Sequence, residues 1–446
     1  MVDFTALRSL LTGALHVPAD SAFALATSGF NLAVVHAPDA VVVVADTADI
    51  SHVVTFARDN RLKVSVQATG HGAESPISGG ILINTSRLDS VSIDADGRLA
   101  TVGAGVRWGA VVAAAADVKL APITGSSPTV GVVGLITGGG LGPLARSHGF
   151  ASDYARGFTV VTGTGDIVEA TATENADLFW ALRGGKVGLG IIAEARIALV
   201  ELENLYAGSL IFSEEHIEAV AQGWARWTES ANADLTTSIS VVRFPGIEVV
   251  PPPLRGRTLL VMHVAYPGDA ITGEGLAAPL RALAPPYLDS LGVLAARDVA
   301  QIHNDPTQPG PGWASGGLLA SIDQKLIAAW LGVVGAGRDI PAVMSEIRHF
   351  GSATTVDVPE GSAASGRSAQ GSLTFIGAPV PDLFTTVVPA AADALFAATA
   401  RWLAPESNVN FAGITRPGQK GSLWSAATAE RLTTIRRRYD PDGVFA

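Results

Sequence analysis

Three glycine-rich stretches in the first half of the chain have the composition of a site for a phosphorylated ligand. They are residues 70–72 with 79–80, residues 131–142, and residues 184–190. Glycine allows close backbone approach, and successive N–H groups in such loops form anion-binding hollows. The first stretch also carries His71, and a neutral imidazole is a good nucleophile near neutral pH. One such stretch alone is equally well explained as a tight turn, but three in one acidic chain favour a pyrophosphate site.

Several other kinds of chemistry are excluded by what the sequence lacks. The chain has no cysteine, which excludes disulfides, a thiolate nucleophile, a thiolate metal site and a cysteinyl cofactor bond. The motifs GxxxxGK(S/T), GxSxG and HExxH are absent, and residues 138–142 follow no clear strand that leads into a helix. We therefore expect no metal. The formal net charge of −11 argues against a nucleic-acid partner.

Length and composition indicate a globular protein of more than one domain. The 446 residues are 48% hydrophobic and 16% charged, which allows a large core. The mean hydropathy of +0.33 comes from Ala, Val and Gly spread along the chain. No apolar run approaches the roughly 20 residues that a membrane-spanning helix needs. The first 20 residues do not have the pattern of a signal peptide, so we expect a cytoplasmic protein with no membrane partner.

The elements that must position the first glycine-rich stretch alternate between strands and helices. A helix with Thr47 as its N-cap and Asn60 as its stop follows the first β-branched strand. The predicted strands of this first domain are residues 41–44, 64–67, 81–85, 99–103, 158–162 and 190–199, and further helices are residues 108–116 and 176–183. His71 thus follows a short strand in a mixed α+β domain that ends near residue 200.

A second unit begins after about Leu202, where the glycine runs become sparse. Strands are predicted near Gly208, Thr237 and Leu259, and helices at residues 215–227 and 324–334. Residues 250–253 and 305–317 are rich in proline or glycine and are predicted to be loops. Two long helices are predicted at residues 391–402 and 426–438.

The segment VSVQATGHG at residues 64–72 resembles the pyrophosphate loop of the vanillyl-alcohol oxidase and p-cresol methylhydroxylase (PCMH-type) flavoproteins, berberine-bridge-enzyme-like branch. The likeness continues through GSSPTVGVVGLITGGGLGPLARSHGFASDY and ADLFWALRGGKVGLGIIAEARIAL, and it resumes at NVNF and RRRYDPDGVF. The resemblance implies an α+β fold with a PCMH-type FAD-binding domain of two α/β subdomains at residues 1–203, completed by residues 405–446. An inserted substrate domain at residues 204–404, built on an antiparallel sheet flanked by helices, is expected between them.

The resemblance implies that FAD is the cofactor and that its 8α-methyl carbon is bonded to His71. A lone loop histidine is usually a surface residue, but the surrounding motif favours attachment. Some relatives carry a second link to a cysteine, and Ser127 stands at that position, so a single histidyl link is expected. Lys186 and Leu189 depart from the family pattern GGGGNFGIV. The implied FAD-contacting residues are Ala68, Thr69, Gly70, His71, Gly72, Ala73, Ser78, Gly79, Ser126, Val130, Gly131, Gly134, Gly138, Gly142, Ile192 and Asn410.

The residue that commonly serves as the catalytic base in the family is not present at the matching position of this chain. Asn408 stands where the family commonly has a tyrosine, and an amide neither accepts nor releases a proton near neutral pH. Asn410 keeps the family's asparagine and could hydrogen-bond the flavin ring. His349 is our first candidate for the base, although a structural role is commoner for such a histidine. The further candidates are Tyr154, Tyr266, His303 and Asp305.

The resemblance implies an FAD-dependent oxidoreductase. We expect an oxidase that moves a hydride from an alcohol, amine or sugar-like C–H of a small organic molecule or secondary metabolite to flavin N5, with O2 reduced to H2O2. A dehydrogenase, an oxidative cyclase or oxygenase, and a catalytically decayed flavin-binding protein are the alternatives. The expected assembly is a monomer or homodimer.

Overall fold

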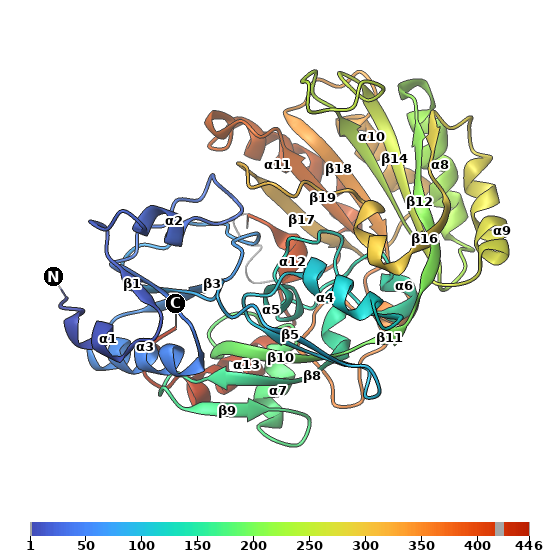
Figure 1. The fold of residues 1–446 in the computed structure, drawn as a ribbon. Helices are drawn as coiled ribbons and strands as arrows, with labels where there is room; N and C mark the ends of the chain where they lie inside the picture. Colours follow the sequence, from blue (N-terminus) through green and yellow to red (C-terminus); the bar gives the residue numbers. More distant parts are fainter. Residues whose placement is uncertain (1, 415–422, 446) are drawn as a thin grey trace.

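The computed structural model describes residues 2–414 and 423–445 and contains three large β-sheets with helices packed around them (Figure 1). This mixture of helices and sheets confirms the predicted α+β class. Residues 415–422 and 446 of the predicted C-terminal segment lie outside the described residues, and the bounds of the three domains stay a prediction. Among the described helices, none is both long enough and apolar enough to cross a membrane.

The first sheet carries the His71 loop. Its order is β1 (Ala14–His16), β2 (Ala40–Val43), β4 (Ile81–Asn84) and β3 (Val64–Gln67), with β1 antiparallel to β2 and the others parallel. The helices beside it are α1 (Thr5–Leu10), α2 (Phe23–Thr27) and α3 (Thr47–Asp59). The prediction of Thr47 as N-cap was one residue late, because the Asp46 side chain accepts the amide of Asp49. Asn60 ends the helix as predicted.

The second sheet is antiparallel and shares core residues with the first. Its order is β5 (Val91–Asp94), β6 (Leu99–Gly103), β10 (Ile191–Ala198), β8 (Ala155–Val161) and β9 (Ile167–Ala170), and β7 (Leu120–Ala121) pairs separately with β11 (Val200–Glu201). Its helices are α4 (Trp108–Ala116), α5 (Val132–Ile136), α6 (Ala145–His148), α7 (Ala176–Leu182) and α13 (Ala426–Tyr439). Although α13 is distant in sequence, its Leu432 and Ile435 lie in one core with Leu178 and Leu182 of α7.

The third sheet has eight strands and is antiparallel. Its order is β15 (Leu288–Asp289), β12 (Asn204–Phe212), β14 (Thr258–Tyr266), β13 (Thr236–Arg243), β18 (Ala342–His349), β19 (Gly371–Gly377) and β17 (Ala314–Leu319), with β16 (Gly292–Ala295) also paired to β12. Its helices are α8 (Ile217–Thr228), α9 (Ala270–Arg281), α10 (Gln324–Val334) and α11 (Val387–Thr399). The predicted loop 305–317 was partly wrong, because β17 begins at Ala314. Within this strand, position 316 is a glycine because a Cβ there would be 2.1 Å from the carbonyl oxygen of Phe411.

The two faces of the third sheet differ in chemistry. One face packs against the helices through apolar side chains, including Ile239, Met262 and Ile347, with Trp224 and Trp330 fully buried among them. Side chains alternate along each strand, so the residues between these point to the opposite face. That face is polar and lies against residues 126–143, with which it shares the Ser126–Asp305 hydrogen bond and a small cavity.

Candidate active site

The loop that carries His71 follows β3 directly. Gly70 has a φ of +70°, and a Cβ there would lie 2.6 Å from the Gly29 Cα, so glycine is required. The His71 ring stacks on Phe30, with ring centroids 3.6 Å apart and planes 15° apart. On another side, His71 Nε2 lies 2.9 Å from Thr129 Oγ1. The imidazole is thereby held in one orientation by two partners.

The environment of His71 keeps its imidazole neutral. Burial, followed by the positive charge of Arg107, lowers the pKa of His71 to about 4. The Thr129 hydroxyl oxygen also lies 3.1 Å from Ser127 Oγ, so three polar groups form a short chain. A neutral imidazole keeps a lone pair on one ring nitrogen, which is the state that nucleophilic attack requires.

A second turn is tied to the His71 loop by His36. His36 Nε2 lies 3.0 Å from Gln67 Oε1, and His36 Nδ1 accepts the amide of Ile77 at 3.0 Å. The next two residues, Ser78 and Gly79, were predicted to contact the pyrophosphate. Gly79 has a φ of +68°, which favours glycine at this turn.

The segment from residue 125 to 142 lies against the His71 loop. A Cβ at Gly131 would lie 3.6 Å from side-chain atoms of Ala68 and Thr69. At Gly72 and Gly134, by contrast, no described atom lies within 4 Å of such a Cβ. We call this glycine-lined region, formed by residues 68–73 and 125–142, the cradle. The space at Gly72 and Gly134 is open, and we call it the open strip; it would accommodate part of the expected FAD.

Asn410, predicted to contact the flavin ring, is engaged by protein atoms at both ends of its amide. Its Nδ2 donates to the Leu135 carbonyl oxygen at 2.8 Å, and its Oδ1 accepts Lys186 Nζ at 3.3 Å. Lys186 also donates to the Gly134 carbonyl oxygen at 2.6 Å, and burial lowers its pKa to about 8. A Cβ at Gly138 would lie 2.0 Å from Asn410 Oδ1, so glycine is required there. The contact of Asn410 with the flavin stays a prediction.

Asn408 has a structural role that explains why the family's tyrosine is absent. It is the N-cap of α12 (Val409–Ala412), and its Oδ1 accepts the Asn410 amide at 3.0 Å. The side chain is 1% exposed, and a tyrosine could not form this cap.

The remaining predicted contacts lie on the cradle or in the sheet behind it. Gly142 must be glycine because a Cβ would lie 1.9 Å from the Thr124 carbonyl oxygen. The Val130 carbonyl accepts the Trp108 amide at 3.0 Å, and Ala73 accepts Asn31 Nδ2 at 3.2 Å. Ile192 is buried in β10 and belongs to the core of the second sheet.

Opposite the cradle, the polar face of the third sheet gathers ionisable side chains. The register pairs Ser238 of β13 with His263 of β14 on one side and with Arg348 of β18 on the other. Glu346, two residues before Arg348, points to the same face, and its Oε2 accepts Arg348 Nε at 2.6 Å. His303 and Asp305 reach this face from the segment after β16. We call His263, His303, Asp305, Glu346 and Arg348 the roof cluster.

The roof cluster touches the cradle through Asp305, whose Oδ2 accepts the Ser126 hydroxyl at 2.6 Å. Burial raises the pKa of Asp305, opposed by this hydrogen bond and by the charge of Arg348. Burial also acts to raise the pKa of Glu346, but Arg348 outweighs it and the net shift is downward. The pKa values of His263 and His303 lie well below the ordinary value, chiefly because of burial. A carboxylate therefore faces two neutral imidazoles.

His349, the first candidate for the base, lies on the wrong face of β18. It is 4% exposed, its Nε2 lies 3.0 Å from Arg146 Nη1, and Trp224 and Trp227 meet its ring edge to face. Burial, with the charge of Arg146, lowers its pKa to about 3. It packs towards α8 and away from the cradle, so the structure gives it a structural role.

The sequence interpretation missed Glu346 and Arg348, although the signal was present. In MSEIRH, the two charged residues flank Ile347, and this alternation indicates a strand with one apolar and one polar face. His303 and Asp305, two of the further candidates for the base, do lie at the polar face. Tyr154, another candidate, has its pKa raised to about 12 by burial, which makes it a poor base at neutral pH.

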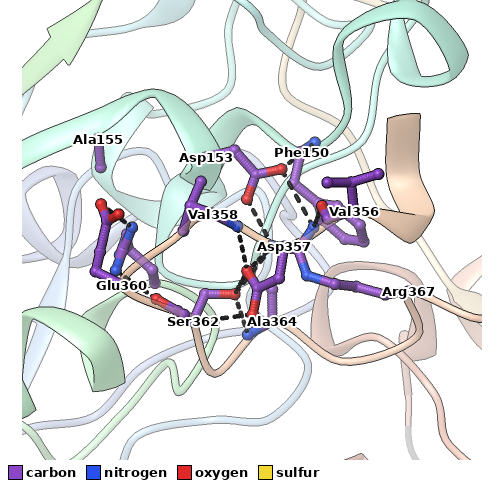
Figure 2. Close-up of polar contacts among 12 residues, drawn as sticks. Phe150, Asp153, Ala155, Val356, Asp357, Val358, Glu360, Ser362, Ala364 and Arg367 are labelled. Atoms are coloured by element: carbon purple, nitrogen blue, oxygen red, sulfur yellow. Dashed lines mark hydrogen bonds and ion pairs between the residues drawn. The ribbon is translucent and has the colours of Figure 1, made fainter.

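A partly buried polar network joins residues 150–155, which follow the cradle in sequence, to the connection from β18 to β19 (Figure 2). Arg367 Nη2 donates to Asp153 Oδ1 at 2.6 Å and lies 2.7 Å from Asp357 Oδ1. Asp153 in turn accepts the Phe150 amide at 3.0 Å. Nearby, Arg183 Nη1 donates to Glu360 at 3.1 Å. Both ion-paired arginines are mostly or fully buried, so these ion pairs connect the two segments away from solvent.

Comparison with known proteins adds independent information on the chain. Residues 38–171 match the family model described as FAD binding domain. (R)-6-hydroxynicotine oxidase from Paenarthrobacter nicotinovorans is 30% identical over 295 residues, which cover 66% of this chain and 63% of that protein. The chain thus spans less than two thirds of this curated relative's length, and 43% and 50% of two further relatives.

Solved structures extend the likeness to nearly the whole chain. The berberine-bridge-enzyme-like protein 1 of Physcomitrella patens aligns with a TM-score of 0.85 and 18% identity, covering 100% of this chain and 98% of that one. Glucooligosaccharide oxidase from Acremonium strictum, described with a 6-S-cysteinyl, 8α-N1-histidyl FAD, aligns with a TM-score of 0.83 and 20% identity, covering 99% and 98%. These likenesses show a shared fold. With the matched FAD-binding domain, they confirm the resemblance of this chain to the PCMH and vanillyl-alcohol oxidase flavoproteins of the berberine-bridge-enzyme-like branch.

Proposed function

We propose that this protein is an FAD-dependent oxidase whose FAD is bonded to His71. The observation that carries the proposal is a neutral imidazole, stacked on Phe30, at the edge of an open glycine-lined cradle that faces a polar roof. The chemistry that FAD supplies when bound is acceptance of a hydride at N5 and transfer of the electrons to O2, which yields H2O2.

Thr129 is proposed to position His71 for attachment. With His71 Nε2–H donating to Thr129 and the Thr129 hydroxyl donating to Ser127, the imidazole lone pair is on Nδ1. This tautomer is inferred from the chain of hydrogen bonds. Nδ1 is then the nucleophilic atom. The glucooligosaccharide oxidase described above carries both a cysteinyl and a histidyl link to FAD. Because this chain has no cysteine, only the histidyl link can form here.

Asp305 is proposed to remove the substrate's hydroxyl or amine proton. Its hydrogen bond to Ser126 places the carboxylate where the roof cluster meets the cradle. It is also the roof-cluster carboxylate without an arginine ion pair, since Glu346 is already paired with Arg348. A general base must lie within reach of both the cofactor and the substrate, and this position meets that requirement.

The substrate is proposed to be a small organic molecule with an alcohol, amine or sugar-like group. The relatives described above include a hydroxynicotine oxidase and a glucooligosaccharide oxidase. The roof cluster offers the Arg348 guanidinium as a donor and the Asp305 carboxylate as an acceptor, which suits a hydroxyl or amine. Fold alone does not select among these substrates.

The attachment is tested by fluorescence of the purified protein on a denaturing gel under ultraviolet light. Wild type is compared with His71→Ala and with a control variant, His16→Ala in β1. We expect fluorescence in wild type and in the control and none in His71→Ala. Persistent fluorescence in His71→Ala contradicts the attachment, and a colourless wild type contradicts the cofactor itself.

The oxidase assignment is tested by a panel of alcohols, amines and sugars under anaerobic conditions. A true substrate bleaches the visible flavin band, and rapid recovery on mixing with air identifies an oxidase. Recovery over minutes instead indicates a dehydrogenase with another acceptor. A product heavier by one oxygen indicates an oxygenase.

A further inference from the structure

Three roof-cluster side chains form a set that the oxidase chemistry does not use. They are His263 on β14, Glu346 on β18 and His303, and they come from separate segments of the chain. All three are well buried, with side-chain exposures of 11%, 3% and 8%. Each offers one metal-ligating atom, and these three atoms lie within 4.8 Å of one another.

The distances within this set suit a shared metal ion better than hydrogen bonds. Glu346 Oε1 lies 4.0 Å from His263 Nδ1 and 3.8 Å from His303 Nε2. Both separations exceed the range of a hydrogen bond. Two ligands of a tetrahedral Zn²⁺ at about 2.0–2.1 Å from the metal lie about 3.4 Å apart, so the two Glu346 separations must shorten by about half an ångström. The His263 and His303 rings stack with their centroids 4.2 Å and their planes 27° apart, so both rings must also turn until one nitrogen of each points to the same ion.

His303 is the strongest single observation. Neither of its ring nitrogens has a hydrogen-bond partner among the described residues, although the side chain is 92% buried. Buried polar atoms are nearly always paired, and an orphaned one commonly marks an ion or water. A neutral imidazole with a free lone pair is also the commonest metal ligand.

The groups around the set act as a supporting shell. Ser238 Oγ donates to Glu346 Oε1 at 2.9 Å and lies 3.1 Å from His263 Nδ1, so its hydroxyl must rotate away when a metal binds. Arg348 holds the other carboxylate oxygen, Oε2, and leaves Oε1 turned to the histidines. The arginine charge weakens cation binding, but it fixes the carboxylate in the ligating orientation.

We propose that His263, His303 and Glu346 bind one transition-metal ion, with Zn²⁺ as the best match to two imidazoles and one carboxylate. This ligand set is used in zinc sites that keep a fourth position open. The proposal replaces the expectation of a metal-free protein, which rested on contiguous motifs. The site uses none of the residues assigned above to FAD attachment or to proton removal, so it is tested independently of the proposed oxidase activity.

Binding is tested on the flavin-containing protein after EDTA treatment and dialysis, by calorimetric titration with ZnCl2. We expect about one Zn²⁺ per chain in wild type and at least a tenfold loss of affinity in His303→Ala and in Glu346→Gln. His216→Ala, a surface histidine in the same half of the chain, is the matched control and should bind as wild type. Wild type that binds no Zn²⁺, or His303→Ala that binds it equally, overturns the proposal.

A second measurement covers the case in which a variant folds poorly. The melting temperature of wild type should rise with ZnCl2, and His303→Gln, which keeps a polar side chain of similar size, should show no rise. Co²⁺ should give a tetrahedral absorption band at longer wavelength than the flavin in wild type, and none in His303→Gln. An equal rise in both proteins overturns the site.

Discussion

The cradle and the roof cluster face each other but are built in opposite ways. The cradle is made from two nearly continuous segments, and its shape depends on missing side chains, as at Gly70, Gly138 and Gly142. The roof cluster is made from side chains on separate strands, brought together by the register of β13, β14 and β18. The comparison teaches that holding a cofactor depends on backbone shape, whereas acting on a substrate depends on side chains that only the sheet brings together.

The largest expected effect comes from the roof. In Asp305→Asn, kcat should fall by about 100- to 10,000-fold, because a carboxylate that accepts a proton is replaced by an amide that does not. Fluorescence on the denaturing gel should remain, because the cradle is unchanged. Steady-state kinetics on a substrate found by the panel check this, with Asp298→Asn from the same segment as control. Full activity of Asp305→Asn moves the base to another group.

The next largest effect is a difference in stability and FAD binding between alanine variants of two glycines of the cradle. Gly138→Ala places a Cβ 2.0 Å from Asn410 Oδ1, so it should destabilise the protein by about 1–3 kcal/mol. Gly134→Ala meets no described atom and, inside α5, should stabilise the FAD-free protein by up to about 1 kcal/mol. If FAD lies along the open strip, Gly134→Ala should nevertheless lose FAD. Urea unfolding and flavin content, measured for both variants, check the pair.

Thr129→Val tests whether Thr129 orients His71 for attachment, in addition to the role of the cradle in holding FAD. Loss of one hydrogen bond should slow covalent incorporation of FAD about tenfold, while non-covalent binding of FAD is kept. The time course of gel fluorescence after FAD is added to FAD-free protein measures the rate. Thr124→Val, which removes a buried hydroxyl without a described partner, is the control. Equal rates in the two variants remove Thr129 from the attachment step.

The smallest expected effect concerns His349, on the face of the third sheet that is covered by helices. His349 has a pKa of about 3 in the folded protein, against about 6.5 when unfolded, so below pH 6.5 only the unfolded state takes up this proton. Stability is therefore complete above pH 6.5 and falls as pH decreases, by up to about 1.4 kcal/mol per pH unit from this residue. His349→Gln should lower that slope by about one proton in urea unfolding between pH 4 and 6. An unchanged slope contradicts the assignment.

Local elements were predictable from the sequence because their signals are contiguous. The strand at residues 64–67 and the helices at residues 108–116 and 324–334 have the bounds that their periodicity predicts. The His71 loop was found in the same way, since its glycines and histidine are adjacent in sequence.

The roof cluster was only partly predictable because strand register is set by distant segments. The sequence prediction named His349 as a candidate base and did not name Glu346 or Arg348, because the face on which each residue lies follows from the pairing of β18 with β13. Asn408 and Lys186 likewise looked like defects of a motif. In the structure, one caps α12 and the other donates to Asn410.

The packing of α13 against α7 has a consequence for how the protein is made. Leu432 and Ile435 complete a core most of whose other members were synthesised more than two hundred residues earlier, before all eight strands of the third sheet. During synthesis on the ribosome, the second sheet therefore keeps an apolar surface exposed until the third sheet and α13 have been synthesised. If FAD is attached to His71 as proposed, its attachment to a finished cradle is a late event in biosynthesis, and chaperone contact with α7 is expected during that interval.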